Sequence, residues 1–424
     1  MTRGTSHYKH KSVLNSSVAT ARVLLVSNIR LTEVGDRCEL RATITGSTLE
    51  NPFALFYRFP SIFKSSVSLT KGDAFLAASL LPAMRTGESL QIAAPVSPRL
   101  LHSIDVIQDI YRSWDPSLST VAITAETKDS AQRDLGDQVG CFFSLGVDSY
   151  YTLLKNVAKH HTDSQMILFL IFVRGFDIPL ANELLSEKVL ATINVVVQEL
   201  EKKTLTIETN LREFSDRYAE WGHLYHGAAL ASVALMFGAL FKTVYIAATH
   251  TYAQMFPWGS HPILDPMWST ETLSIVHDGC EMRRVDKIRF IAQFPIALRT
   301  LRVCWLNPDS EYNCGRCEKC MRTMIGLHVA GALAKCETLP HFVDPTAVRS
   351  MRVEGANERS FVEELIASLS SSNTDLPIKS ALEEVLHQSN STRESLRLET
   401  LFFKVLQRIY FRAFGRRMCR ELAR

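Results

Sequence analysis

The sequence contains no apolar run long enough to cross a bilayer, and it has little net charge. Its longest apolar runs are Met166–Val173 and Ala228–Phe241, whereas a membrane-spanning helix needs about 20 residues. The formal net charge of +3 predicts no general attraction to nucleic acid or to anionic membranes. The basic N-terminus is not followed by the apolar segment of a signal peptide. We therefore expect a globular cytoplasmic protein that binds neither membranes nor, by charge alone, nucleic acid.

The cysteines do not form a disulfide pattern, because five of the nine are isolated in the sequence. The isolated ones are Cys38, Cys141, Cys280, Cys336 and Cys419. The other four, spaced C-x9-C-x2-C-x2-C, are Cys304, Cys314, Cys317 and Cys320. Two overlapping C-x2-C steps place three thiolates on a tight turn and the fourth completes a tetrahedron, which is the geometry that Zn²⁺ prefers. Because four thiolates leave no open position for water, we predict a structural zinc site.

The chain divides into four segments by composition and pattern. Residues 1–20 are rich in Ser, Thr, Lys and His and are expected to be disordered. Residues 21–130 mix β-branched runs with amphipathic ones, which predicts an α+β accessory domain. Residues 138–335 form an α/β domain, and residues 336–424 a helical C-terminal extension. The extension ends in a stripe of arginines at positions 408, 412, 416, 420 and 424, which indicates a solvated helix face or a surface for nucleic acid, an acidic partner or a membrane.

Segments typical of strands and helices alternate along residues 138–335. The predicted strands are Val139–Phe143, Met166–Val173, Thr204–Thr209 and Val244–Ala248. The predicted helices between them are Asp148–His161, Leu184–Lys202 and Tyr225–Leu240. The continuous apolar strands are typical of a parallel sheet buried on both faces. This order predicts a doubly wound parallel sheet.

The turn after the first of these strands has the composition of an anion-binding loop. It reads F-S-L-G-V-D-S, with Ser144, Gly146, Asp148 and Ser149 between strand and helix. A glycine permits close approach of the backbone, the hydroxyls donate hydrogen bonds, and the helix N-terminus adds free N–H groups. We interpret the loop as a phosphate or pyrophosphate site, in which Asp148 either caps the helix or holds Mg²⁺.

The same loop resembles the S-G-G-x-D-S loop of the PP-loop ATP pyrophosphatases, which cleave ATP to AMP and pyrophosphate. The match departs at Leu145, where that family usually has glycine. The resemblance implies the fold of that superfamily, with ATP and Mg²⁺ as cofactors. It also implies a catalytic role for Asp148. The implied nucleotide-binding residues are Ser144, Leu145, Gly146, Val147, Asp148 and Ser149.

Together, the loop and the cysteine cluster resemble the 7-cyano-7-deazaguanine synthases, over residues 138–335. Members of that family carry a similar zinc site followed by an arginine, here Arg322. The resemblance implies AMP transfer to a deazaguanine-like carboxylate and displacement of AMP by ammonia or an amine. Relatives in bacterial defence systems imply a protein acceptor, for which the N-terminal domain is the candidate contact.

Four further residues are candidates beside the loop. Lys287, in R-R-V-D-K-I-R-F, resembles the family's phosphate-binding lysine, and the alternative is a solvated helix face. Asp177 and His250 follow predicted strands at the ligand edge, so they either contact substrate or are loop residues. Arg322 either binds a phosphate or substrate carboxylate or supports the zinc turn.

Two other functions remain open at this stage. One is a different amide ligase or a sulfurtransferase of the same superfamily. A sulfurtransferase requires a reactive thiol near the loop, and Cys280 is the candidate because Cys141 lies on a buried strand. The other is a non-catalytic, zinc-stapled module that binds a partner or nucleic acid.

Overall fold

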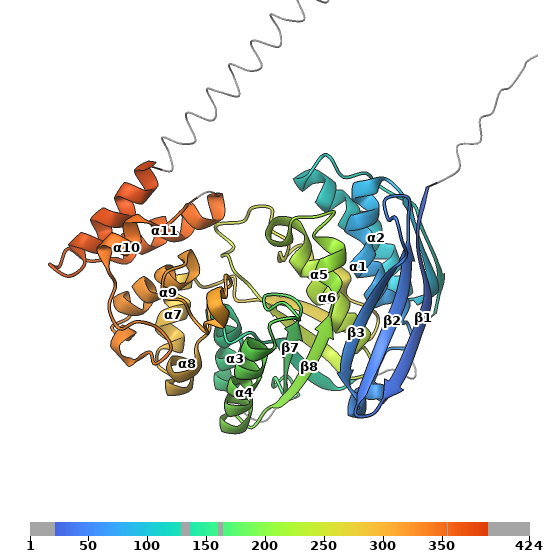
Figure 1. Ribbon diagram of the computed structural model, residues 1–424, viewed down its shortest axis with the longest axis horizontal. Helices are drawn as coiled ribbons and strands as arrows, with labels where there is room; N and C mark the ends of the chain where they lie inside the picture. Colours follow the sequence, from blue (N-terminus) through green and yellow to red (C-terminus); the bar gives the residue numbers. More distant parts are fainter. Residues whose placement is uncertain (1–21, 129–135, 160–163, 354, 389–424) are drawn as a thin grey trace, which may run out of the picture.

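The computed structural model describes residues 22–128, 136–159, 164–353 and 355–388, and it is built around one ten-stranded sheet (Figure 1). The strand order is β10-β9-β6-β7-β8-β3-β2-β1-β4-β5, and most neighbouring pairs are parallel. The strands are β1 Val23–Val34, β2 Arg37–Thr45, β3 Phe53–Pro60, β4 Ser89–Val96, β5 Ile123–Thr127, β6 Gln138–Phe142, β7 Phe169–Arg174, β8 Lys203–Thr209, β9 Phe241–Ala247 and β10 Ser274–Asp278. The expectation of an α/β architecture with a largely parallel sheet is confirmed.

Helices cover this sheet, and the C-terminal ones lie on the side of the molecule away from β1, β2 and β3 (Figure 1). The α-helices are α1 Gly72–Thr86, α2 Pro98–Trp114, α3 Val147–Lys159, α4 Glu183–Glu199, α5 Leu211–Ser215, α6 His226–Met236, α7 Arg284–Ile291, α8 Pro295–Thr300, α9 Glu318–Val329, α10 Pro345–Arg349 and α11 Ala356–Ser368. A π-helical turn, Trp221–Tyr225, leads into α6. Among the helices that the structure describes, none combines the length and apolarity needed to cross a membrane.

The β6–β10 half of the sheet is wound on both faces. Along β7, Leu170 and Phe172 pack with α3, α4 and α9, whereas Ile171 and Val173 pack with α1 and α6. Every residue of β7 but its last is buried, as expected for a strand covered on both sides. The strand order reverses between β6 and β9, which lie side by side although two strands separate them in the chain. This switch point is where an open α/β sheet leaves a crevice for ligands.

The N-terminal strands continue the same sheet. β3 pairs with β8 antiparallel at Tyr57–Thr209 and Arg58–Glu208, and the Asn210 side chain extends the ladder by bonding the backbone of Phe56 and Ala54. The burial of β2 alternates, so one face of this half is covered and the other faces solvent. α1 covers the buried face and packs against both β4 and α6. The expected α+β elements are therefore built into one continuous sheet with the α/β half.

The C-terminal helices pack on the face that carries α3. α7 lies against α3 and α9, and α11 packs on α7 and α9. The expected disorder of residues 1–20 and the expected arginine stripe of the extension lie outside the described residues. Elements that were not expected include β4, β10 and the buried inner face of α7.

Candidate functional site

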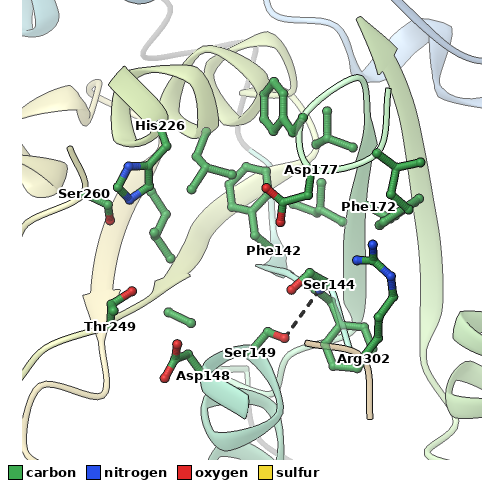
Figure 2. Close-up of a pocket in the computed structure, with 18 of the residues that line it drawn as sticks. Phe142, Ser144, Asp148, Ser149, Phe172, Asp177, His226, Thr249, Ser260 and Arg302 are labelled. Atoms are coloured by element: carbon green, nitrogen blue, oxygen red, sulfur yellow. Dashed lines mark hydrogen bonds between the residues drawn. The ribbon is translucent and has the colours of Figure 1, made fainter. Parts of the chain in front are cut away.

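The loop of residues 144–149 lies at the switch point of the sheet and borders a cavity of about 220 Å³. The cavity opens at the carboxyl ends of β6, β7 and β9, where Phe142, Val173 and Ala247 contribute to its wall. Figure 2 shows Ser144, Asp148 and Ser149 on one side of this space and His226, Thr249 and Ser260 on another. The structure therefore places the loop of residues 144–149 at the position where ligands bind in such sheets.

The cavity has an aromatic wall as well as a polar end. Phe142, Phe172, Phe176 and Trp221 line it, and Phe176 stacks at a tilt on Trp221 with ring centroids 5.1 Å apart. Apolar and aromatic walls of this kind are typical of small-molecule pockets, in which a few convergent polar groups fix the orientation of the ligand.

The backbone of the loop is bent at Leu145, which has a φ of 64°. This left-handed conformation normally selects glycine, because a Cβ there crowds the following carbonyl. The Leu145 side chain is fully buried in the core shared with α3 and α7, and its carbonyl accepts a hydrogen bond from the Arg302 amide at 2.9 Å. Leucine thus occupies the loop in the dihedral region that glycine favours, and apolar burial offsets the strain.

Asp148 binds two cations from α7. Its Oδ2 accepts a hydrogen bond from Arg284 at 2.6 Å, and its Oδ1 lies 3.4 Å from Lys287 Nζ. Burial opposes ionisation of Asp148, but Arg284 and Lys287 outweigh it and lower the pKa of the carboxyl. Because both carboxylate oxygens contact cations, Asp148 forms ion pairs and does not cap α3.

Lys287 is completely buried, so the alternative of a solvated helix face is wrong. Its Nζ donates a hydrogen bond to the Ala248 carbonyl at 2.6 Å, directly after β9. A buried ammonium needs compensation by charge and hydrogen bonds, which Asp148 and this carbonyl supply. The lysine is thereby fixed between α3 and the end of β9.

Arg302 is a site residue that the sequence analysis missed. It lines the cavity, its side chain is buried, and its Nε has no hydrogen-bond partner among the described residues. Figure 2 shows its guanidinium beside Ser144. Burial lowers the pKa of Arg302 from its usual value. The sequence carried one sign of this role: Arg302 stands between the apolar residues Leu301 and Val303. An arginine in such a position is expected to be buried, and a buried arginine usually has a partner.

Asp177 and His250 are placed differently from one another. Asp177 is exposed at the rim of the cavity, with its backbone carbonyl accepting a hydrogen bond from Asn307 at 2.8 Å. His250 is half-buried among aromatic rings, 4.4 Å from Phe256 and 5.3 Å from Phe361 between ring centroids. Burial lowers the pKa of His250 to about 3, so the imidazole is neutral at physiological pH and is not merely an exposed loop histidine.

Arg322 lies on α9 and is buried. Its Nε is 3.3 Å from Glu318 Oε1, and its guanidinium carbon lies 3.9 Å from the centre of the Phe361 ring. Burial lowers its pKa to about 10, so it stays charged at neutral pH. The residue is thus brought near Arg284 and Asp148, which act on it electrostatically.

A second buried polar network borders the cavity at Ser260. The Ser260 hydroxyl donates to Asp265 Oδ2 at 2.6 Å, and the same oxygen lies 2.8 Å from His277 Nδ1. Burial opposes protonation of His277, but Asp265 outweighs it and raises the pKa of the imidazole to about 9. This charged pair fixes the loop that carries Ser260 against β10.

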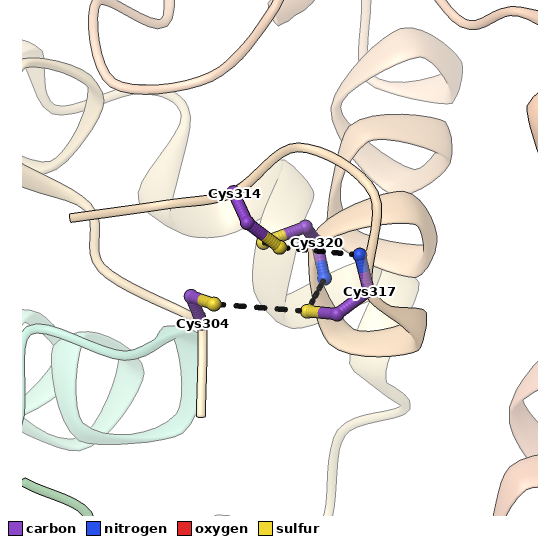
Figure 3. A group of neighbouring side chains, drawn as sticks. All are labelled: Cys304, Cys314, Cys317 and Cys320. Atoms are coloured by element: carbon purple, nitrogen blue, oxygen red, sulfur yellow. Dashed lines mark hydrogen bonds between the residues drawn. The ribbon is translucent and has the colours of Figure 1, made fainter. Parts of the chain in front are cut away.

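The four clustered cysteines form a candidate metal centre (Figure 3). All four sulfurs lie within 4.8 Å of one another, and the Cys314–Cys320 and Cys304–Cys317 sulfurs are each 3.9 Å apart. Thiolates about 2.3 Å from a tetrahedral zinc ion are about 3.8 Å from each other. The donor set and its spacing therefore fit Zn²⁺, and the cluster could bind such a metal.

Backbone groups hold this centre in shape. The amides of Cys317 and Cys320 donate to the sulfurs of Cys314 and Cys317, and Cys317 forms the N-cap of α9. Asn313 accepts hydrogen bonds from the amides of Val303 and Cys304 at 2.8 and 3.1 Å. Asn313 thus ties the distant first cysteine to the turn that carries the other three.

The two cysteines considered for sulfur transfer are both buried. Burial raises the pKa of the Cys141 thiol, which disfavours the reactive thiolate. Cys280 follows β10 and is only 2% exposed. An accessible thiol beside the loop is therefore not seen among the described residues.

Comparison of the chain with protein-family models, with curated proteins and with solved structures finds no match. The site is therefore interpreted from its own geometry.

Proposed function

We propose that this protein binds ATP at the switch-point cavity and transfers AMP to a carboxylate, which a nitrogen nucleophile then converts to an amide. The observation that carries this proposal is the convergence of the loop of residues 144–149 and two buried cations, Arg284 and Lys287, at the carboxyl ends of β6 and β9. A fixed set of positive groups beside a helix N-terminus suits a polyphosphate.

The residues present fit a nucleotide. The aromatic wall of the cavity would hold the adenine, and the hydroxyls of Ser144 and Ser149 with the first amides of α3 would hold the phosphates. The first amides of a helix have no intrahelical acceptor, so they are available to phosphate oxygens. Mg²⁺ would arrive on the nucleotide, because the nearest carboxylate, Asp148, already contacts two cations.

The reaction requires charge neutralisation more than proton transfer. A carboxylate oxygen of the acceptor attacks the α-phosphorus, and pyrophosphate leaves with the electrons of the broken P–O bond. Lys287 and Arg284 neutralise the charge that develops on the leaving pyrophosphate. The nitrogen nucleophile then attacks the acyl carbon, and AMP departs as the leaving group. A deazaguanine-like acid is the proposed acceptor, and ammonia or an amine is the proposed nucleophile.

Zinc would be structural in this scheme. Cys304, Cys314, Cys317 and Cys320 would fill its coordination sphere, so it supplies folding free energy and no reactive water. Because Cys317 caps α9, the ion would fix that helix, and with it Arg322, against the α/β half.

The proposal is tested on the full-length, zinc-loaded protein by calorimetric ATP binding and by chromatographic detection of AMP. We expect ATP binding, and AMP release when Mg²⁺, ammonium and 7-carboxy-7-deazaguanine are present. Lys287→Gln should lower AMP formation by roughly 100-fold, the scale found when one charge-stabilising group is removed. Lys155→Gln is the matched control, because Lys155 lies on α3 but pairs with Asp278 and Glu281.

A folded wild-type protein that does not bind ATP would contradict the nucleotide site. Equal AMP formation by Lys287→Gln and Lys155→Gln would contradict the assigned role of Lys287. ATP binding without AMP release from any carboxylate in a panel of deazapurine acids would favour the non-catalytic module.

A further inference from the structure

The ring of Phe361, on α11, lies on a group of positively charged and aromatic side chains. The guanidinium carbons of Arg322 and Arg284 are 3.9 and 5.7 Å from the ring centre. The imidazole of His250 stacks on the same ring at 5.3 Å with an interplanar angle of 18°. Three planar nitrogen-containing groups from α7, α9 and the loop after β9 therefore surround one flat hydrocarbon ring. We call Arg284, Arg322 and His250 the covered cluster.

The covered cluster holds buried hydrogen-bond donors that have no acceptor. Nε and Nη1 of Arg322 and Nε of Arg284 lack a hydrogen-bond partner among the described residues, although Arg322 is only 3% exposed. The ion pair of Arg322 with Glu318 lacks hydrogen-bond geometry. The void beside these groups measures about 10 Å³, which is at the lower limit for one water molecule.

Unpaired charged donors in an apolar interior are costly. Phe361 offers them a π-face, which attracts cations, but it has no oxygen to accept their hydrogen bonds. A flat anionic ligand would provide both interactions: its ring would stack on the guanidinium and imidazole planes, and its oxygens would accept the unpaired hydrogen bonds. Phe361 thus provides the stacking interaction to the covered cluster but not the hydrogen-bond acceptors.

The covered cluster adjoins the cavity of the proposed nucleotide site. Arg284 binds Asp148, which lines the cavity, and His250 directly follows Thr249, which also lines it. A ligand on the cluster would therefore lie on the β9 side of Asp148, near the proposed phosphates.

A polar contact adds to the apolar packing of Val362 and Leu365 that holds α11 over the cluster. Glu364 Oε1 accepts a hydrogen bond from the Val285 amide, in the first turn of α7, at 2.6 Å. This amide belongs to the set that a helix N-terminus leaves without an internal acceptor. Glu364 therefore closes α11 onto α7 one turn beyond Phe361, without contributing a cation to the cluster.

We propose that α11 is a lid, and that the covered cluster beneath Phe361 is the binding site for a planar aromatic carboxylate, the acceptor of the reaction. That the ligand is the acceptor rests on the proposed function, whereas the presence of the site does not. Opening α11 withdraws Phe361 and exposes the unpaired donors to the ligand. Because only open molecules bind the ligand, the apparent Kd equals the Kd of the open form divided by the fraction of molecules that are open.

The test measures binding of indole-3-carboxylate to the full-length, zinc-loaded protein by calorimetry without ATP. Glu364→Ala removes the polar contact between α11 and α7, which weakens the closed state and leaves the covered cluster intact, so it should bind the probe roughly tenfold more tightly than wild type. Phe361→Ala should also bind more tightly. Arg322→Gln combined with Glu364→Ala should lose the gain. Zinc content and a cooperative melting transition confirm that each variant is folded.

Two further probes test the chemistry of the ligand. Neutral indole and non-planar cyclohexanecarboxylate should gain little from Glu364→Ala, because each lacks one of the two required features. Folded Glu364→Ala and Phe361→Ala proteins that bind indole-3-carboxylate no better than wild type would overturn the proposal. Equal gains for inorganic phosphate and indole-3-carboxylate would overturn the assignment of a planar ligand. Because ATP is absent, failure of ATP cleavage and failure of the lid are distinguishable.

Discussion

Replacing Leu145 by glycine and by alanine gives an unusual stability order if the loop has the conformation described. Leu145 has a φ of 64° and is fully buried. Both substitutions remove the same buried isobutyl contacts and should each destabilise by about 2–5 kcal/mol, as large-to-small core changes do. They differ because alanine keeps a Cβ in the left-handed region, at a cost of about 1–2 kcal/mol, and glycine does not. After the greater chain entropy of glycine is subtracted, Leu145→Gly should be more stable than Leu145→Ala by about 1 kcal/mol.

Leu153 provides the control. It lies in α3, eight residues further along, and is also fully buried. In a helix interior glycine is less stable than alanine by about 1 kcal/mol, so Leu153→Gly should be the weaker of its pair. The stability difference between the Gly and Ala variants therefore has opposite signs at positions 145 and 153, and the two differences are about 2 kcal/mol apart.

Urea unfolding of the four variants, followed by tryptophan fluorescence, measures both differences. The reasoning would be refuted if Leu145→Gly had a lower urea midpoint than Leu145→Ala, provided that the free energy of unfolding depends equally steeply on urea in both variants. The same variants report on function, because Leu145→Gly should keep the loop in place for ATP, whereas Leu145→Ala should weaken ATP binding.

Two further predictions concern the metal centre and a buried ion pair. The purified protein should contain about one zinc per chain, and Cys317→Ser should lower both the zinc content and the melting temperature. Cys336→Ser is the control, because Cys336 is buried outside the cluster, and it should leave the zinc content unchanged. A metal-free Cys317→Ser protein with the wild-type melting temperature would rule out the site. Because the pKa of His277 is raised from 6.5 to about 9 in the folded protein, its pairing with Asp265 stabilises fully below about pH 6.5 and the contribution disappears as the pH rises through about 9. The stability difference between wild type and His277→Gln should therefore shrink from pH 6 to pH 10, and a constant difference would contradict this ionisation.

Local pattern in the sequence was enough to predict most elements of the α/β half. β7 is an apolar run and α3 has a regular apolar stripe, so both were found within a few residues of their observed bounds. β10 was missed because Ser274–Asp278 has only two apolar residues and pairs on one side only. Its place in the sheet comes from pairing with β9, which no pattern within the segment encodes.

The candidate site was predictable where its residues are consecutive. The loop of residues 144–149 and the cysteine turn are short motifs, and the structure places the loop beside a cavity and the four cysteines together. The burial of Lys287 was not predictable, because α7 is strongly charged in sequence and its inner face is defined by Asp148, far away in the chain. Phe361 and Arg302 were missed for the same reason: their partners are fixed by tertiary packing.

The seam between β3 and β8 has a practical consequence for shortening the chain. Removal of the strands before β6 would leave β8, in which polar and apolar residues alternate, as an open edge whose N–H and C=O groups could pair with another copy. It would also strip α1 from α6, an almost wholly buried and apolar helix. A truncated α/β half would therefore self-associate, and the N-terminal strands protect its edge in the full chain.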